Sequence, residues 1–358
     1  MTMIKHSLND AITSPHNQSP PLGTRFMHND ITSRYLQQKT IGLIGYGNQG
    51  RPQALNLRDS GHKVLIGVRP NGPSAQQAAL DGFTPQGMTD VVQQSDLIML
   101  MLPDDAMETV FTQYIQPHLQ PHHIIGVIHG LSLISGWLHI PTENAVILAA
   151  AKGQGRGVRQ KFLEGSGVPG LVAIHQHGLQ NETTASNTAL SIALEYLQAL
   201  GCGHSGITLT TPKEEAITNL FAEQTILCGG LSHLIQASFD TLIERGYSED
   251  IAYTECLHEV KLLADLIYEK GLVGMRQAIS PTARFGDLTR GPRVIDGHVK
   301  HTLNLILDEI ESGQFANELK HEAQNNYLQT KNTLTTHTHH PIEAAHKRYL
   351  AKQQTQSH

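Results

Sequence analysis

Short apolar runs alternate with segments of helical spacing in the first part of this chain. The runs, which we predict to be strands, lie at residues 40–44, 63–68, 97–102, 124–129, 145–149 and 171–175. Strands that alternate with helical segments are typical of βαβ units, whose strands pair in parallel. We therefore predict an α/β fold in this part, with one more helix near 185–200.

The pattern changes at Thr211, where helical spacing takes over. Thr211 offers a capping hydroxyl, Pro212 suits the first helical position, and two acidic residues follow in the first turn. Apolar positions then recur at helical spacing until Gly246. Ser248 begins a further helix, which Gly271 should end. The second part is therefore predicted to be all-α.

These patterns divide the chain into four parts. Residues 1–29 mix Ser, Pro, Asn and His without periodicity and are predicted to be a loose extension. The α/β domain is placed at 30–210 and the α-helical domain at 211–345. The polar residues 346–358 are predicted to form a mobile tail.

Composition narrows the class of protein. The 358 residues carry a formal net charge of -6, which gives no basis for binding nucleic acid. No apolar run approaches the roughly 20 residues of a membrane span, so we expect no membrane partner. Cys202, Cys228 and Cys256 form neither a metal-binding spacing nor an even set for disulfides. A reducing, cytoplasmic location is therefore expected.

A glycine motif follows the first predicted strand directly. In G-x-G-x-x-G, the first glycine permits a tight turn, the second lets the backbone approach a pyrophosphate, and the third lets the next helix pack closely. The helix N-terminus adds unpaired N–H groups and a positive partial charge. We predict a dinucleotide site here rather than a purely structural turn. Its residues are Gly45, Tyr46, Gly47, Asn48, Gln49 and Gly50.

The ends of two later strands should complete this site. Arg69 follows the second strand, near the position where NAD-specific enzymes usually carry an acid, and a base there suits the 2′-phosphate of NADPH. Ser74 adds a hydroxyl to the same loop. Pro103 and Asp104 follow a later strand and should border the cofactor cleft. NADPH is the expected cofactor, and NADH is the alternative.

Two pairs of oxygen-bearing side chains lie in the helical half. Asn219 and Glu223 are four residues apart, as are Glu255 and Glu259. Side chains at this spacing lie on one face of a helix. Two such helices facing each other would give a hard divalent cation such as Mg²⁺ a cluster of oxygen ligands. The alternative is a plain solvated helix face.

Longer strings give the chain a resemblance to a known family. It resembles ketol-acid reductoisomerase, the acetohydroxyacid isomeroreductase of branched-chain amino acid synthesis, from residue 31 to about 351. The matching strings include GYGNQG (45–50), ALNLRDSG (54–61), LPDD (102–105), GVPGLVAIHQ (167–176), GPRVI (291–295) and HPIE (340–343). The compact length is similar to the short-form enzymes. In these, an all-α knotted domain follows a Rossmann NADP-binding domain.

The resemblance also implies a reaction and roles for residues. The family binds two Mg²⁺ ions, shifts an alkyl group in 2-acetolactate or 2-aceto-2-hydroxybutyrate, and reduces the resulting ketone with NADPH. Glu255 and Glu259 would come from a partner subunit, so a homo-oligomer would share each active site. The implied metal ligands are Asn219, Glu223, Glu255 and Glu259. The implied catalytic residues are Lys152, His129, Glu259 and Ser280, of which Ser280 binds the substrate carboxylate.

One departure from the family pattern affects the metal site. Asn219 stands where the family has an aspartate that bridges both ions. An amide oxygen can bind one cation, but it carries no charge and does not bridge two ions as a carboxylate does. The alkyl shift depends on two ions, whereas hydride transfer asks for less. One Mg²⁺ ion is therefore expected more readily than two.

Other departures lie around the same cleft. Ala151 and Arg156 flank the Lys152 segment where the family has Pro and His, and Pro281 and Arg284 follow Ser280 where it has Asn and Glu. Departures concentrated at a site indicate changed chemistry. Arg156 and Arg284 would add positive charge there and could take over part of the role of the missing metal charge.

Three functions are therefore weighed. The leading one is an NAD(P)H-dependent reductase, diverged toward hydride reduction of a small 2-keto or imino substrate and weakened as an isomerase. The alternative is a Mg²⁺-dependent ketol-acid reductoisomerase that converts 2-acetolactate to 2,3-dihydroxyisovalerate in valine and isoleucine synthesis. The third is a non-catalytic cofactor-binding scaffold.

Overall fold

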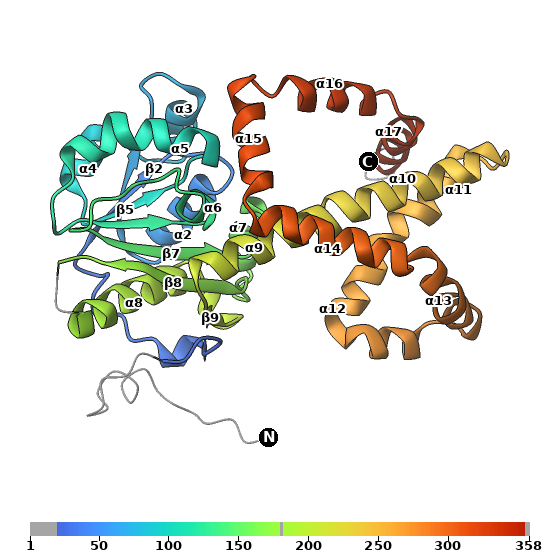
Figure 1. Cartoon of the computed structure of the whole chain (residues 1–358), viewed down its shortest axis with the longest axis horizontal. Coiled ribbons are helices and arrows are strands. Elements are labelled where there is room, and N and C mark those ends of the chain that lie inside the picture. Colours follow the sequence, from blue (N-terminus) through green and yellow to red (C-terminus); the bar gives the residue numbers. More distant parts are fainter. Residues whose placement is uncertain (1–19, 180–181, 355–358) are drawn as a thin grey trace. The chain divides into compact units, whose positions relative to one another are not determined.

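The chain has two compact units. The computed structural model is described for residues 20–179 and 182–354, and Figure 1 shows it coloured along the sequence. The units are Met1–Ile217 and Thr218–His358. The expected boundary at 211 marks the start of helix α9 (Pro212–Ala222), whereas the division falls within this helix.

One sheet forms the centre of the first unit. In the described part it has nine strands in the order β1-β9-β8-β7-β6-β5-β2-β3-β4. Neighbours from β7 to β4 pair in parallel, as the βαβ pattern predicts, while β8 is antiparallel to β7 and β1 to β9. The strands are β1 (Arg25–Phe26), β2 (Thr40–Ile44), β3 (Lys63–Gly67), β4 (Pro85–Gln86), β5 (Leu97–Leu100), β6 (Ile124–Val127), β7 (Ala145–Ala151), β8 (Gly170–His177) and β9 (Ile207–Leu209).

Helices cover both faces of this sheet (Figure 1). Ile41 and Leu43 of β2 pack in one core cluster with residues of α2, α7 and α8. Ile44 packs on the other face with α4 and α5, because successive side chains of a strand point to opposite faces. The helices of this unit include α2 (Gly50–Asp59), α3 (Pro73–Leu80), α4 (Met88–Gln94), α5 (Asp104–Val110), α6 (Leu131–Ile134), α7 (Gly155–Leu163) and α8 (Glu182–Ala199).

Part of the expected loose extension belongs to the sheet. The pair Arg25–Phe26 forms edge strand β1, and Phe26 is only 4% exposed. Further along, the buried carboxylate of Glu195 accepts hydrogen bonds from the backbone N–H groups of residues 34–36 at 2.7–3.2 Å. The prediction of a loose extension is therefore wrong for residues 25–29, and residues 1–19 lie outside the described part.

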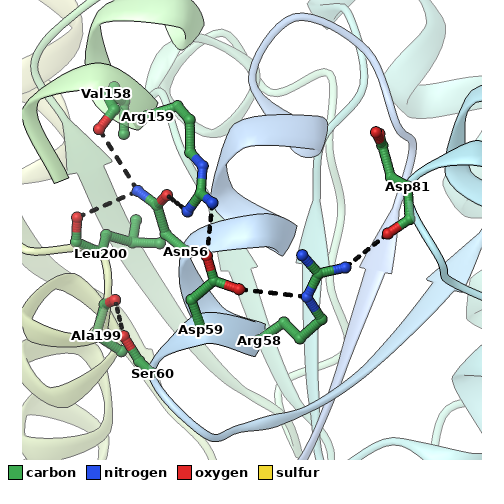
Figure 2. Close-up of polar contacts among 9 residues, drawn as sticks. All are labelled: Asn56, Arg58, Asp59, Ser60, Asp81, Val158, Arg159, Ala199 and Leu200. Carbon is green, nitrogen blue, oxygen red and sulfur yellow. Dashed lines mark hydrogen bonds and ion pairs between the residues drawn. The ribbon is translucent and has the colours of Figure 1, made fainter. Parts of the chain in front are cut away.

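The ALNLRDSG segment joins three helices (Figure 2). Asn56 on α2 is fully buried, and its Nδ2 donates to the carbonyls of Val158 on α7 and Leu200 after α8, at 3.5 and 3.4 Å. Arg159 on α7 donates to Asn56 Oδ1 at 2.9 Å and to Asp59 Oδ2 at 2.5 Å. These contacts fix α2, the helix that begins at the glycine motif.

The second unit is helical, as predicted. Glu214 N–H donates to Thr211 Oγ1 at 3.0 Å, which is the expected cap at the start of α9. Gly246 and Gly271 take positive φ values of 84° and 68°, and the latter kinks α12 at the predicted end of a helix. From α10 on, the α-helices are α10 (Gly229–Glu244), α11 (Glu249–Tyr253), α12 (Glu259–Ala278), α13 (Pro281–Val294), α14 (Gly297–Glu311), α15 (Gln314–Gln324), α16 (Leu328–His337) and α17 (Pro341–Gln354).

The predicted C-terminal tail is largely a helix. α17 runs through Gln354, and Ile342 and Ala345 bury their side chains in a small core with Phe239 and Tyr253. Polar composition hid this helix, because its apolar stripe has few members. The prediction of a mobile tail is therefore wrong for residues 346–354, and 355–358 lie outside the described part.

Much apolar surface of the second unit is uncovered. From residue 218 on, nineteen large hydrophobic side chains are exposed and nine apolar residues are buried among those described. The helical run Pro212–Glu244 is apolar and long enough to cross a membrane by length and composition, and 6% of its most apolar window is buried. Such a surface calls for a partner of some kind.

Candidate active site

The glycine motif forms a tight turn between β2 and α2. A side chain at Gly45, whose φ is +109°, would lie 2.5 Å from the carbonyl oxygen of Met101. One at Gly50 would lie 2.5 Å from the carbonyl oxygen of Gly45, whereas one at Gly47 would meet nothing within 4 Å. The outer glycines are thus required by packing. Gly47 leaves the backbone open to a ligand, as a pyrophosphate at the start of α2 requires.

A second loop closes on the glycine motif. Gly155, at the start of α7, approaches Asn48 so closely that an added Cβ would lie 1.7 Å from the Asn48 carbonyl oxygen. Gln49 Nε2 donates to the Gly153 carbonyl at 2.9 Å, and Gln53 Nε2 donates to Gln49 Oε1 at 3.3 Å. The loop after Lys152 is thereby fixed against the predicted cofactor site.

Tyr46 points its side chain into the protein. It is 3% exposed, and its hydroxyl donates to Asp81 Oδ2 at 2.9 Å. Arg51 donates to both Asp81 oxygens at 2.6 and 2.9 Å. Burial raises the pKa of the Tyr46 phenol, and the Arg51 guanidinium lowers the pKa of Asp81 to about 2. Tyr46 can therefore offer a cofactor its backbone, while its side chain anchors the glycine loop to the end of α3.

Arg69 and Ser74 lie at the two ends of one loop. Arg69 follows β3 and is exposed, and Ser74 is in the first turn of α3, which Gly72 precedes. A cavity of about 350 Å³ adjoins this loop, lined by Val68 and Asn71 among others. A guanidinium, a hydroxyl and a helix N-terminus on one loop are groups that can bind a phosphate. Arg69 and Ser74 are not among the residues that line this cavity, so the 2′-phosphate site stays a prediction.

Lys152 is held by a buried glutamate. Lys152 Nζ lies 3.1 Å from Glu215 Oε1, and the other Glu215 oxygen accepts the N–H of Gly130 at 2.9 Å. The Glu215 side chain has no exposed surface. The sequence indicates Glu215 only as an acid in the first turn of a helix, and no local signal marks it as a site residue. Glu215 therefore links Lys152 to Gly130, the residue that follows His129.

His129 presents a buried nitrogen at the carboxyl edge of the sheet. Its Nδ1 accepts the N–H of Leu131 at 3.3 Å and lies 3.9 Å from Asp104 Oδ2. A neutral ring with an accepting Nδ1 carries its proton on Nε2. This Nε2 is buried and has no hydrogen-bond partner within the described residues. Pro103 is the N-cap of α5, and Asp104 is the first residue of that helix. Both follow strand β5, which pairs with β2, the strand before the glycine motif.

The first predicted ligand pair lies at the start of a π-helical turn. Asn219 is on α9, and Glu223 begins the π-helical segment Glu223–Leu227, whose i to i+5 pattern includes Cys228 N–H to the Glu223 carbonyl at 3.0 Å. Added side chains at Gly229 and Gly230 would lie 2.1 and 1.9 Å from the carbonyl oxygens five residues earlier. This glycine pair therefore makes the wide turn possible. Such turns are frequent at functional sites.

The second pair lines a cavity. Glu255 is in the π-helical segment Thr254–His258, and Glu259 begins α12. Both border a cavity of about 510 Å³. Its other walls are an acid and a set of apolar side chains, namely Asp287, Val260, Leu262, Leu263, Leu266, Met275, Ile279 and Ala283. Glu255 and Glu259 therefore lie on one face, as predicted, and this face borders a largely apolar cavity.

Ser280 and Arg284 lie beside this cavity with different roles. Ser280 Oγ accepts the N–H of Ala283 at 3.1 Å and caps α13, which leaves its hydroxyl proton available to a carboxylate. Arg284 donates to the carbonyls of Arg276, Gln277 and Ile279 at 2.6–3.3 Å. The guanidinium thus completes the end of α12. The structure gives no support to the expectation that Arg284 replaces metal charge.

The donor set suits a hard cation, although one chain does not assemble it. Glu223, Glu255 and Glu259 offer carboxylate oxygens, and Asn219 offers an amide oxygen, which are the ligand types Mg²⁺ prefers. Within residues 20–179 and 182–354, no three His, Cys, Asp or Glu side chains gather in a group able to hold a metal. The fit is therefore chemical, and the predicted sharing between subunits stays a prediction.

Comparison with known proteins identifies both halves of the chain. Residues 35–206 match the family model of the acetohydroxy acid isomeroreductase NADPH-binding domain, and residues 213–354 match the ketol-acid reductoisomerase C-terminal domain. A ketol-acid reductoisomerase (NADP(+)) from Petrotoga mobilis (strain DSM 10674 / SJ95) is 42% identical over 293 residues, covering 82% of this chain and 87% of that protein.

Solved structures agree with this result. An NADH-preferring ketol-acid reductoisomerase from an uncultured archaeon matches with a TM-score of 0.88 and 32% identity, covering 92% of this chain and 98% of that one. A semialdehyde dehydrogenase NAD-binding protein from Cupriavidus necator, solved with calcium and NAD, has 17% identity and a TM-score of 0.57 over 77% of this chain and 99% of that one. The latter shows likeness of fold alone.

These findings confirm the predicted order of domains, a Rossmann-like α/β domain followed by a helical one. The knot in the helical domain stays a prediction. The family models cover most of the chain, and the relative from Petrotoga is well above the identity that chance gives. The chain belongs to the ketol-acid reductoisomerase family and is an oxidoreductase of its NADP-dependent kind.

Proposed function

We propose that this protein is a Mg²⁺-dependent ketol-acid reductoisomerase that isomerises and reduces 2-acetolactate or a similar 2-aceto-2-hydroxy acid with NADPH. The observation that carries the proposal is the cavity of Glu255 and Glu259. Carboxylates on one wall suit the cation that a hydroxy acid binds, and the apolar walls suit its short alkyl groups.

The chain supplies the cation ligands and a carboxylate site. Asn219, Glu223, Glu255 and Glu259 would hold Mg²⁺, with the last two donated by a second subunit. The Ser280 hydroxyl, at the N-terminus of α13, would donate to the substrate carboxylate. When bound, Mg²⁺ polarises the substrate oxygens and NADPH supplies the hydride.

Residues of the first unit would manage charge and protons. The Lys152 ammonium, which Glu215 orients, would stabilise negative charge that develops on a substrate oxygen. His129 Nε2–H would be a second donor, since it is buried and meets no hydrogen-bond partner among residues 20–179 and 182–354. Arg69 and Ser74 would select NADPH over NADH through the 2′-phosphate.

A second candidate is a reductase without isomerase activity, acting on a small 2-keto or imino compound. Asn219 favours it, because one neutral ligand weakens a site for two ions. The position of Arg284 speaks against it, because this guanidinium binds the carbonyls at the end of α12. The further acid on the cavity wall, Asp287, is paired with Arg276 at 2.6 Å. We therefore rank the reductase without isomerase activity second.

The apolar surface of the second unit supports a homo-oligomer. Ile226 and Leu227 in the first π-helical segment, and Leu262 and Leu263 on α12, are each 43–62% exposed and lie near the proposed ligands. A second copy would cover these faces and bring the two ligand pairs together. Analytical ultracentrifugation should show at least a dimer without detergent. A monomer that needs detergent would instead assign the helical run Pro212–Glu244 to a membrane and remove the predicted cytoplasmic location.

A direct assay tests the proposed reaction. Purified protein is mixed with 2-acetolactate, NADPH and millimolar Mg²⁺, and NADPH oxidation is followed by absorbance. We expect turnover that disappears with a chelator and returns with added Mg²⁺. A parallel assay uses a simple 2-keto acid and a cyclic imine.

The outcomes separate the three functions. Chelator-insensitive turnover of the keto acid or imine, with none of 2-acetolactate, would establish the diverged reductase. NADPH binding without turnover of any of these compounds would indicate the scaffold. Retained reduction of 3-hydroxy-3-methyl-2-oxobutyrate, with no turnover of 2-acetolactate, would show that Asn219 removes the alkyl shift alone.

A further inference from the structure

The HPIE string at 340–343 has no part in the proposed reaction, yet it begins a helix that packs against α11, the helix before the acidic pair. His340 Nδ1 accepts the N–H of Ile342 at 3.3 Å, which places the proton of a neutral ring on Nε2. Nε2 then donates to Asp240 Oδ1 on α10 at 3.0 Å. The histidine therefore fixes the first turn of α17 to α10.

One face of α17 docks on α11 and the π-helical turn that follows it. Ile342 and Ala345 are buried against Phe239, Ala252 and Tyr253, and the partly buried side chains packed on this cluster include Cys256 and Leu257. Figure 1 shows α17 beside α10 and α11. The contact thus reaches the turn Thr254–His258 itself.

Two aromatic contacts continue this face toward the acids. Tyr253 OH and His346 Nδ1 are 2.7 Å apart, and the Tyr349 ring lies 5.3 Å from Tyr253 and 5.0 Å from His258, between ring centroids. His258 directly precedes Glu259 in the sequence. Ion pairs from Arg348 to the acids that begin α11, at 2.7 and 2.9 Å, close the other end of the contact.

A π-helical turn needs such support. Its hydrogen-bond pattern is rare and occurs mostly as single turns inside α-helices. In Thr254–His258, Glu259 N–H reaches back to the Thr254 carbonyl, so the direction of both carboxylates depends on the turn staying wide. Return to α-helical geometry would rotate Glu255 relative to Glu259, since each residue of an α-helix turns by about 100°.

We infer that α17 positions the acidic pair: Tyr349 and His346 hold the π-helical turn from one side, so that Glu255 and Glu259 face the cavity on the other. They are positioning residues and touch neither the substrate nor the cation. This inference rests on the proposed function for its consequence, because the pair must bind Mg²⁺ for its direction to matter. That α17 holds the turn Thr254–His258 is argued from the contacts alone and does not depend on the proposed function.

The test compares Tyr349→Ala with Leu350→Ala in the full-length protein. Leu350 is the neighbouring residue on α17 and is 43% exposed, so its truncation controls for loss of helix mass. Tyr349→Phe keeps the ring and serves as the conservative rescue. Hydrogen exchange of amides 254–262 reports the turn, and titrations report Mg²⁺ and NADPH affinity.

We expect Tyr349→Ala to speed exchange at 254–262 and to weaken Mg²⁺ binding about tenfold, in the range of changes to residues that support metal ligands. NADPH affinity should stay unchanged, and Leu350→Ala and Tyr349→Phe should match the wild type. Faster exchange confined to 341–354 would overturn the inference. If the wild type binds no Mg²⁺, the proposed function fails, and the exchange data still decide whether α17 holds the turn.

Discussion

The two units build their sites by different means. In the first unit, the predicted cofactor site consists mainly of backbone, namely a glycine turn, a helix N-terminus and a second loop that packs closely against the turn. In the second, the proposed metal site consists of side chains on or next to two π-helical turns, and large apolar side chains around them are exposed. The predicted cofactor site lies within one unit, whereas the proposed metal site would need a second subunit.

The two kinds of site differ in the substitutions that they tolerate. A backbone site tolerates few substitutions, because a methyl group added at Gly45 or Gly50 would overlap a carbonyl. A side-chain site can lose a charge, as at Asn219, without disturbing the helix that carries it. We therefore expect divergence in this chain to affect metal chemistry before cofactor binding, and five substitutions test that expectation.

The largest effect should come from Glu259→Gln. The substitution removes one negative charge from the cavity wall, so Mg²⁺-dependent turnover should fall by at least about a hundredfold. The matched control is Glu269→Gln, an exposed acid on the same helix. NADPH affinity, measured by fluorescence titration, should be unchanged in both variants. Equal loss of NADPH binding would contradict the separation of the two sites.

Two glycine variants should affect the first unit differently. Gly50→Ala brings a Cβ to 2.5 Å from a backbone oxygen, so it should lower stability by about 1–3 kcal/mol as well as NADPH affinity. Gly47→Ala meets nothing within 4 Å, so it should keep the wild-type Tm and lose about tenfold in NADPH affinity. Calorimetry measures the Tm of each variant, and titration measures its NADPH affinity. Unchanged NADPH affinity in Gly47→Ala would place the pyrophosphate elsewhere.

Asn219→Asp should strengthen the second site. A carboxylate in place of the amide adds charge to the ligand set, and Mg²⁺ affinity should rise about tenfold by isothermal titration. Asn219→Ala is the control for loss of the oxygen and should weaken binding. If all three proteins bind Mg²⁺ equally, residue 219 is not a ligand.

The smallest effect concerns Asp81. Its pKa is lowered from 3.8 to about 2, chiefly by the hydrogen bond from Arg51, so the stability it contributes is present above pH 3.8 and is lost as pH falls toward 2. Arg51 is 48% exposed, so solvent screening limits the contribution to about 1 kcal/mol. Asp81→Asn should therefore lower Tm slightly at neutral pH, and the difference from the wild type should vanish near pH 2.

The sequence predicts the first unit well because its signals are local. All six predicted strands are present, with ends shifted by a few residues. Strands β1, β4 and β9 have two or three residues each and show no periodicity that could predict them. Burial of Glu215 likewise has no local sign, since first-turn acids of exposed helices have the same pattern.

In the second unit, the sequence predicts helix ends and faces but not their support. Thr211, Gly246 and Ser248 mark helix ends where expected. The spacing of Glu255 and Glu259 predicts a shared face, and both line one cavity. The π-helical turns and the docking of α17 depend on contacts between segments about ninety residues apart, as between Tyr253 and His346. The spacing of residues within one segment does not reveal these contacts.

The wide turn at Glu223 also sets the phase of a long helix. Each π-helical turn holds one residue more than the α-helical ladder requires, so residues before and after it differ by about 100° from a regular helix. Deleting one residue between Glu223 and Gly229 would restore a regular ladder at little local cost. It would also rotate Asn219 and Glu223 away from the side of the helix on which the apolar residues of α10 lie. Insertions and deletions in this stretch should therefore abolish the site while leaving a well-formed helix.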